Sequence, residues 1–244
     1  MISSLDARAH RRTGCTIGVL LLVQLIFAPV SNFVLLKPVF AAPGFLENAA
    51  AHSLQMSLGA LLGLAMGAIS LGIAIAAFPL FRPLNRTLAL WFLALAVASF
   101  SLTAVESTTV MSMLSLSQAY ARATSVDGEL FQGLRVVVAS ARNWAHYIGL
   151  MVAGSMVFVL YAVLWRFTLV PRALAAFGMA AALLQIAAVT MPLFGRPIVF
   201  LMLLPLGLSH LALSAWLVAK GFAERGQTAS PARRSTMRSS GEAT

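Results

Sequence analysis

Six polar side chains interrupt the long apolar stretches of this sequence, and they are the candidates for a single binding pocket. They are His52, Glu106, Arg142, Asn143, His146 and His210. A carboxylate beside an arginine and histidines can hold a polar ligand, because these groups supply both hydrogen-bond donors and acceptors. Such groups are costly to place in hydrocarbon, so their presence there indicates a function. No catalytic residue is predicted among them.

Four of these residues are expected at the same depth, near the outer end of their apolar segments. Glu106 lies about 28 Å along its apolar segment, near the outer end, if the helix rises 1.5 Å per residue. His52 begins the preceding segment on the same side. Arg142 and His146 are four residues apart and share one helix face. We therefore expect an outward-facing polar pocket; the alternative is that each residue separately reaches lipid headgroups and water.

His210 differs from the other candidates because it lies deep in the last apolar segment, five residues after Pro205. It could bond to backbone near the proline, or face a cavity with Gln24 or Gln185. A haem or metal ligand would need a second histidine, for which His146 is the available partner. Their expected depths differ by about 15 Å, which argues against that pair. No metal site and no cofactor are predicted.

The elements that must position these residues are membrane-spanning helices. The chain has 244 residues, of which 60% are hydrophobic and 10% charged, whereas soluble domains carry roughly 25% charged residues. A spanning helix needs about 20 apolar residues. The predicted fold is an all-α bundle of six transmembrane helices, with spans at about 14–36, 53–81, 87–107, 143–165, 171–191 and 197–222. The third helix can continue to 123, and residues 14–222 form the transmembrane domain.

Three local features refine this prediction. Pro29 is expected to kink or end the first helix, and Pro205 to kink the sixth. Leu130, Leu134, Val137 and Val138 recur at helical spacing, so an amphipathic helix over 127–142 is expected before the fourth span, with Asp127 as its N-cap. Residues 223–244 lack an apolar period and are rich in Ser, Arg, Thr and Ala, which predicts a disordered basic tail.

The distribution of basic residues predicts the orientation. Twelve of the 17 lysines and arginines lie in residues 1–13, the second-to-third and fourth-to-fifth loops, and the tail. The other five are Lys37, Arg122, Arg135, Arg142 and Arg196. The positive-inside rule places both termini, residues 1–13 and 223–244, in the cytoplasm.

A stripe of small residues marks the second span. Gln55, Gly59, Gly63 and Gly67 recur at every fourth position and so share one helix face. Glycines allow the backbone of a neighbouring helix to approach closely, which drives helix association in lipid. Packing within the bundle is the favoured interpretation, and a homodimer or contact with another protein is the alternative.

The remaining signals limit the partners and the chemistry. The formal net charge is +10, but the basic residues form no face interleaved with aromatics, so no nucleic acid is expected. The predicted partners are the lipid bilayer and anionic lipid at the tail; a merely solvated tail is the alternative.

Cys15 is the single cysteine, so an internal disulfide is excluded. There is no Walker A loop, Gly-x-Ser-x-Gly, His-Glu-x-x-His or Cys-x-x-Cys motif.

Several stretches together resemble a bacterial family of small polytopic membrane proteins of unknown function, DUF4386. They are Arg12 with Gly18, and residues 58–62, 79, 83–90, 114–118, 142–145, 169–174 and 215–222. The resemblance implies the fold over most of residues 11–222 but no activity. Where the family pattern often has Arg and Glu in the third span and Glu in the sixth, this chain has Ala96, Ser99 and His210. Glu106, two turns beyond Ser99, is the substitute that this comparison suggests.

Three functional hypotheses follow from these observations. The first is a non-enzymatic binding or accessory component with a polar pocket near the outer membrane face. The second is a small-solute or proton-coupled transporter that works through Glu106, Arg142 and His210; inverted repeats would favour it, and no clear internal repeat is seen. The third is a membrane redox or lipid-modifying enzyme, which would need a bound haem, quinone or lipid.

Overall fold

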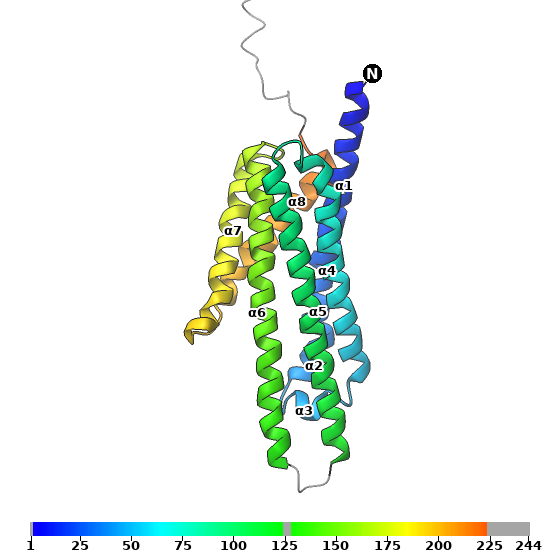
Figure 1. Cartoon of the computed structure of the whole chain (residues 1–244), viewed down its shortest axis with the longest axis vertical. Helices are drawn as coiled ribbons and strands as arrows, with labels where there is room; N and C mark the ends of the chain where they lie inside the picture. Colours follow the sequence, from blue (N-terminus) through cyan, green and yellow to red (C-terminus); the bar gives the residue numbers. More distant parts are fainter. Residues whose placement is uncertain (1, 124–127, 224–244) are drawn as a thin grey trace, which may run out of the picture.

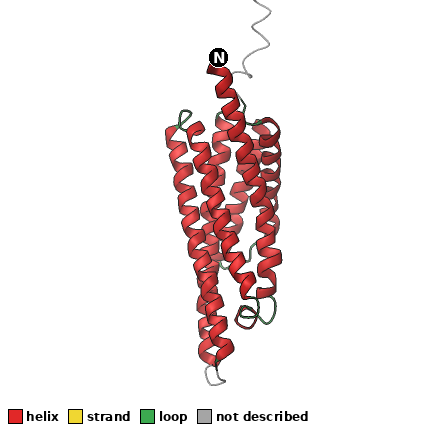
Figure 2. Ribbon diagram, turned by 90° about the vertical axis from the view of Figure 1, so that its right-hand side faces the viewer, coloured by secondary structure: helices red, strands yellow, loops and turns green. Residues whose placement is uncertain are grey.

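The protein is a ring of long helices. The computed structural model describes residues 2–123 and 128–223, which form helices joined by short connections and contain no strand (Figures 1 and 2). The long helices are α1 (Ile2–Pro29), α4 (Ser53–Phe81), α5 (Arg86–Arg122), α6 (Gly128–Arg166), α7 (Arg172–Thr190) and α8 (Leu204–Lys220). From α4 to α8 each packs against the next, and α1 closes the ring against α4 and α8.

The predicted fold class is confirmed, because six helices of the described chain are long and apolar enough to cross a membrane. The protein is therefore a multi-pass membrane protein. The bounds of the second span, Ser53–Phe81, are those expected from the sequence. Asn85 caps α5, since its side-chain Oδ1 accepts a hydrogen bond from the Leu88 amide at 3.0 Å.

The two ends of the bundle differ. The end that we call the terminal end holds the start of α1, the α4–α5 and α6–α7 connections and the end of α8 (Figure 1). At the opposite end, the hairpin end, α5 and α6 project beyond the other helices. These two helices have 37 and 39 residues, so each is more than 50 Å long at about 1.5 Å per residue. That exceeds a hydrocarbon layer of about 30 Å.

Pro29 ends the first α-helix, as predicted. A π-helical segment, η1 (Val30–Leu36), follows it directly, and the short α2 (Lys37–Phe40) and α3 (Phe45–Asn48) complete the connection to α4. Proline has no amide hydrogen for the helix ladder, which explains the change of hydrogen-bonding pattern here. The segment around α3 is attached to α5 by Ser117, whose hydroxyl donates to the Leu46 carbonyl at 2.7 Å and accepts from the Ala50 amide at 2.8 Å.

The prediction of a kink at Pro205 inside the sixth span is wrong. Pro205 lies in the first turn of α8, and the preceding residues form the 3₁₀ helix η4 (Phe200–Leu203). The first turn of a helix leaves its amide groups unpaired, so a proline is accommodated there without disturbing the ladder. The fifth span likewise ends in a 3₁₀ helix, η3 (Met191–Phe194).

The region before the fourth span is helical, but it is not a separate helix. It is the start of α6, which runs to Arg166 without a break. Val136 and Val137 point in different directions around the helix, and both are 64% exposed. The amphipathic character of this region stays a prediction. Asp127 and residues 224–244, which carry the predicted N-cap and most of the predicted tail, lie outside the described residues.

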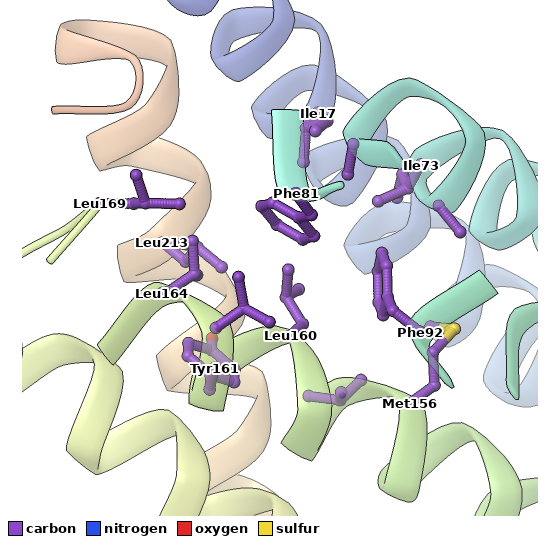
Figure 3. Close-up of a cluster of buried hydrophobic side chains, with 14 of the residues drawn as sticks. Ile17, Ile73, Phe81, Phe92, Met156, Leu160, Tyr161, Leu164, Leu169 and Leu213 are labelled. Carbon is purple, nitrogen blue, oxygen red and sulfur yellow. The ribbon is translucent and has the colours of Figure 1, made fainter. Parts of the chain in front are cut away.

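The main apolar core fills the half of the bundle nearer the terminal end. It is built from α1, α4, α5, α6, α7 and α8, and its fully buried members include Ile17, Phe81, Phe92, Tyr161 and Leu213 (Figure 3). In α4 the buried members run from Ile73 to Phe81, and in α5 from Ala89 to Ala96. The core therefore closes this half of the ring with aliphatic and aromatic side chains.

Candidate functional site

A cluster of three ionisable side chains connects α5 with α6. The Glu106 Oε1 atom lies 2.9 Å from His146 Nδ1 and 3.4 Å from Arg142 Nη2. All three side chains are mostly buried, with exposed fractions of 24% for Glu106, 28% for His146 and 15% for Arg142. Because α5 and α6 are antiparallel neighbours, the level of Glu106 on one meets the levels of Arg142 and His146 on the other.

Arg142 is held in place by contacts besides Glu106. Its guanidinium carbon lies 5.3 Å from the centroid of the Phe40 ring, and Nη1 donates to Asn143 Oδ1 at 3.5 Å. The cation over an aromatic face is an attractive contact, stronger where water is excluded. The Nε atom is buried and has no hydrogen-bond partner. Arg142 therefore depends on Glu106 for its charge-assisted contact.

A cavity of about 280 Å³ adjoins this cluster, between α1 with η1, α4, α5 and α6. Its polar lining comprises Ser31, Asn32, Ser70, Ser99, Thr103, Glu106, Ser107 and His146. Ser107 donates to the Ala60 carbonyl at 3.3 Å, and Thr103 to the Ser99 carbonyl at 3.0 Å. The hydroxyl groups of Ser31 and Ser99 make no hydrogen bond with the described residues. Both hydroxyls are thus available to a ligand.

Glu106 also has a free acceptor. Both of its contacts fall on Oε1, and no hydrogen bond from the described residues reaches Oε2. That oxygen is not among the fully buried unpaired atoms, so it keeps accessible surface. The cavity therefore combines one free carboxylate oxygen with two free hydroxyl groups.

The cavity ends near the middle of the bundle. Gln24 donates through Nε2 to Ser70 Oγ at 2.6 Å and to the Met66 carbonyl at 2.9 Å, which joins α1 to α4 at the cavity lining. The members of the main core in α4 all follow Ser70, and those in α5 all precede Ser99. A second, smaller apolar cluster of α4 and α5 residues lies on the other side, towards the hairpin end. The polar lining is consequently confined to the half of the bundle towards the hairpin end.

The glycine stripe lines this cavity and meets two neighbouring elements. A Cβ atom added to Gly59 would lie 2.9 Å from Leu36 Cδ2 in η1, and one added to Gly67 would lie 3.0 Å from Phe100 Cδ2 in α5. At Gly63 the nearest atom would be Ser107 Oγ, at 3.6 Å. The stripe thus contacts its own chain along α5 and η1, and a homodimer through it stays a prediction.

Of the six predicted pocket residues, Glu106 and His146 line the cavity. Arg142 contacts Glu106 but is not part of the described lining, and Asn143 lines a separate groove.

The two remaining histidines bond to backbone. The Nδ1 atom of His52 is 2.9 Å from the Asn48 carbonyl oxygen, before α4 begins. That of His210 is 2.9 Å from the Leu206 carbonyl oxygen, and the ring meets Tyr161 edge to face with centroids 6.1 Å apart. Neither histidine lines the cavity. The two glutamines expected near His210 bond elsewhere: Gln24 to Ser70, and Gln185 to the Leu150 carbonyl at 3.2 Å. The side chain of His210 therefore pairs with neither of them.

The structure adds polar groups that the sequence analysis did not select. Ser99, Thr103 and Ser107 lie four residues apart, so they form one polar face of α5 opposite the glycine stripe. That spacing was readable in the sequence. Ser31 and Asn32 were not identifiable in this way, because their direction depends on the π-helical turn of η1.

Comparisons with known proteins identify a family but no activity. No curated protein and no solved structure matches the chain. One family model does match, over residues 16–221, and its description is a domain of unknown function, DUF4386. This match covers α1 from residue 16 onward and the other five long helices in full. The protein therefore belongs to the DUF4386 family.

Proposed function

We propose that the protein binds a small, uncharged polar solute in the cavity between α1, η1, α4, α5 and α6. The observation that carries this proposal is that Glu106, whose Oε2 atom is unpaired, lines the same cavity as Ser31 and Ser99, whose hydroxyls make no hydrogen bond with the described residues. A carboxylate oxygen accepts hydrogen bonds, and hydroxyls both donate and accept them. A solute that carries hydroxyl, amine or amide groups satisfies all three.

Charge and size narrow the ligand class. Arg142 lies against the carboxylate of Glu106 and offsets its charge, so a neutral solute leaves no uncompensated charge in the bundle. The volume of about 280 Å³ is at the lower limit of small-molecule pockets, which begin near 300 Å³. The ligand is therefore a compact molecule rather than a lipid or a peptide.

We further propose that the cavity faces the outside of a bacterial plasma membrane, with both termini in the cytoplasm. The terminal end carries Arg82, Arg86, Arg166, Arg172 and Lys220, and it also holds the start of α1 with Arg11 and Arg12. Basic residues accumulate in cytoplasmic loops. In this orientation the solute enters from outside, and the apolar core closes the cytoplasmic half.

A larger side chain in the cavity should weaken solute binding. Ser99→Leu places an isobutyl group where the free hydroxyl lies, so we expect at least a tenfold weaker affinity. Ser101→Leu is the matched control, because Ser101 is exposed and lies on the same helix. Equilibrium dialysis of the purified protein with radiolabelled glycerol, a monosaccharide and a small amide measures the binding. Absence of binding for all three solutes, or equal binding by the wild type and Ser99→Leu, would count against the proposal.

A second candidate function is transport of the same solute. It is favoured by the π-helical η1, which lines the cavity directly after Pro29. Short π-helical segments inside α-helices occur frequently at functional sites, and here a return to α-helical pairing would move Ser31 relative to the cavity. Flux into proteoliposomes separates the two functions: a transporter accumulates the labelled solute across the membrane, whereas a binding protein only retains it at the cavity.

A further inference from the structure

A second hollow lies at the hairpin end, on another side of α6. It is a groove of about 570 Å³ between α6 and the connection that carries α2 and α3. The side chains that matter for its chemistry are Phe40, Arg135, Val136, Asn143, Trp144 and Tyr147. The groove shares no lining residue with the solute cavity. Its occupant is therefore a separate question.

The groove joins one unpaired cation to an apolar surface. Arg135 is its only charged lining residue, is half-buried, and makes no hydrogen bond or ion pair with the described residues. Its Nη1 atom lies close to Gly44, where Glu47 also approaches without forming an ion pair. Phe40, Val136 and Trp144 each remain at least 39% exposed. A free guanidinium beside exposed apolar side chains has the chemistry that recognises an anionic amphiphile.

The tryptophans of α6 place this groove at a membrane surface. Trp144 and Trp165 are both exposed, and 21 residues of helix separate them by about 32 Å at 1.5 Å per residue. That spacing matches a hydrocarbon layer of about 30 Å, at whose two surfaces tryptophan and tyrosine are enriched. Tyr147 packs edge to face against Trp144, with centroids 6.1 Å apart. The groove thus begins at the interface and rises towards Arg135.

From this arrangement we propose that the groove binds an anionic phospholipid of the membrane leaflet at the hairpin end. Arg135 holds the phosphate, and an acyl chain lies over Val136, Phe40 and Trp144 before it enters the bilayer. Arg135 lies about 13 Å beyond Trp144 along the helix, so the bound lipid stands raised above its neighbours. This position accounts for the exposed side chain of Val136, about 12 Å beyond Trp144 along the helix, because the acyl chain covers it.

Native mass spectrometry with two lipids tests this site. Purified protein is mixed with phosphatidylglycerol or phosphatidylcholine, and the fraction that retains each lipid is measured. We expect the wild type to retain phosphatidylglycerol in preference. Arg135→Gln should lower that preference about fivefold, the effect of one basic residue at an anionic surface, and Arg135→Lys should keep most of it. Arg196→Gln is the matched control, because Arg196 is an exposed arginine on the α7–α8 connection.

Three results would overturn the proposal. One is equal retention of the two lipids by the wild type. Another is an equal loss in Arg135→Gln and Arg196→Gln, which would indicate a general surface charge effect. The third is a bound protein chain that Arg135→Gln releases, because the groove would then be a protein interface. The solute cavity contributes to none of these readouts, so its own proposal stands or fails separately.

Discussion

Replacing Gly178 with alanine should destabilise the protein more than the same substitution at any other described glycine. A Cβ atom added at this position in α7 would lie 2.2–2.4 Å from three atoms of the Tyr161 ring. Tyr161 is completely buried, and its hydroxyl donates to Ser209 at 3.2 Å. The ring therefore cannot move away without opening the core (Figure 3). We expect a loss of about 3 kcal/mol, at the upper end for overpacked cores, and a fall of several degrees in the melting temperature in detergent.

Gly72→Ala is the control for this experiment, because nothing lies within 4 Å of a Cβ atom added there. Alanine favours helix over glycine by about 1 kcal/mol, so Gly72→Ala should leave the melting temperature unchanged or raise it. Combining Gly178→Ala with Tyr161→Leu should cost less than the sum of the two single changes, since the shorter side chain relieves the overlap. Equal melting temperatures for Gly178→Ala and Gly72→Ala would show that α6 and α7 are not packed in this way.

Replacing Glu106 with glutamine should lower both the stability of the protein and its affinity for the solute. The change leaves Arg142, which is 15% exposed and already has an unpaired Nε atom, without its carboxylate partner. Loss of a charged partner from a buried group costs about 1–3 kcal/mol, and the partial exposure here favours the lower part of that range. Thermal melting measures the stability, and equilibrium dialysis with the labelled solutes measures the binding.

Glu129→Gln is the matched control, because Glu129 is exposed near the start of α6 and should tolerate the change. Arg142→Gln completes a double-mutant cycle with Glu106→Gln. If the two side chains stabilise each other, the double variant should lose less than the sum of the single losses, by about 0.5 kcal/mol or more. Strict additivity in this cycle would contradict the contact between α5 and α6 on which the site depends.

The sequence was sufficient to predict the depth of the polar residues but not their direction around each helix. Depth follows from the rise of 1.5 Å per residue, and by that measure Glu106, Arg142, His146 and His52 were expected at one level. The structure joins the first three, whereas His52 bonds to the Asn48 carbonyl. Rotation about the axis depends on which face packs against a neighbour, and an apolar helix in lipid carries little amphipathic signal to indicate it.

The effect of each proline on its helix could be predicted only in part, for a similar reason. The sequence shows that neither Pro29 nor Pro205 can donate a backbone hydrogen bond to a helix ladder. It does not show whether the helix kinks, ends or begins there, because that depends on how the neighbouring residues pack. After Pro29 the chain becomes π-helical and lines the cavity, whereas Pro205 lies in the first turn of α8. The hydroxyl face of Ser99, Thr103 and Ser107 could have been found from its four-residue spacing opposite the glycine stripe.

Cysteine labelling tests whether the polar cavity is reached from the face of the membrane at the hairpin end, as we propose. In a chain with Cys15→Ser, single Ser31→Cys and Ser99→Cys variants are treated with a small, charged thiol reagent from either side of sealed vesicles. Gly133→Cys, at an exposed position of the hairpin, identifies its face, and Ser214→Cys, in the fully buried core, measures background. We expect both cavity cysteines to react from the Gly133 side alone. Unreactive cavity cysteines, or reaction from the terminal side, would contradict the proposal.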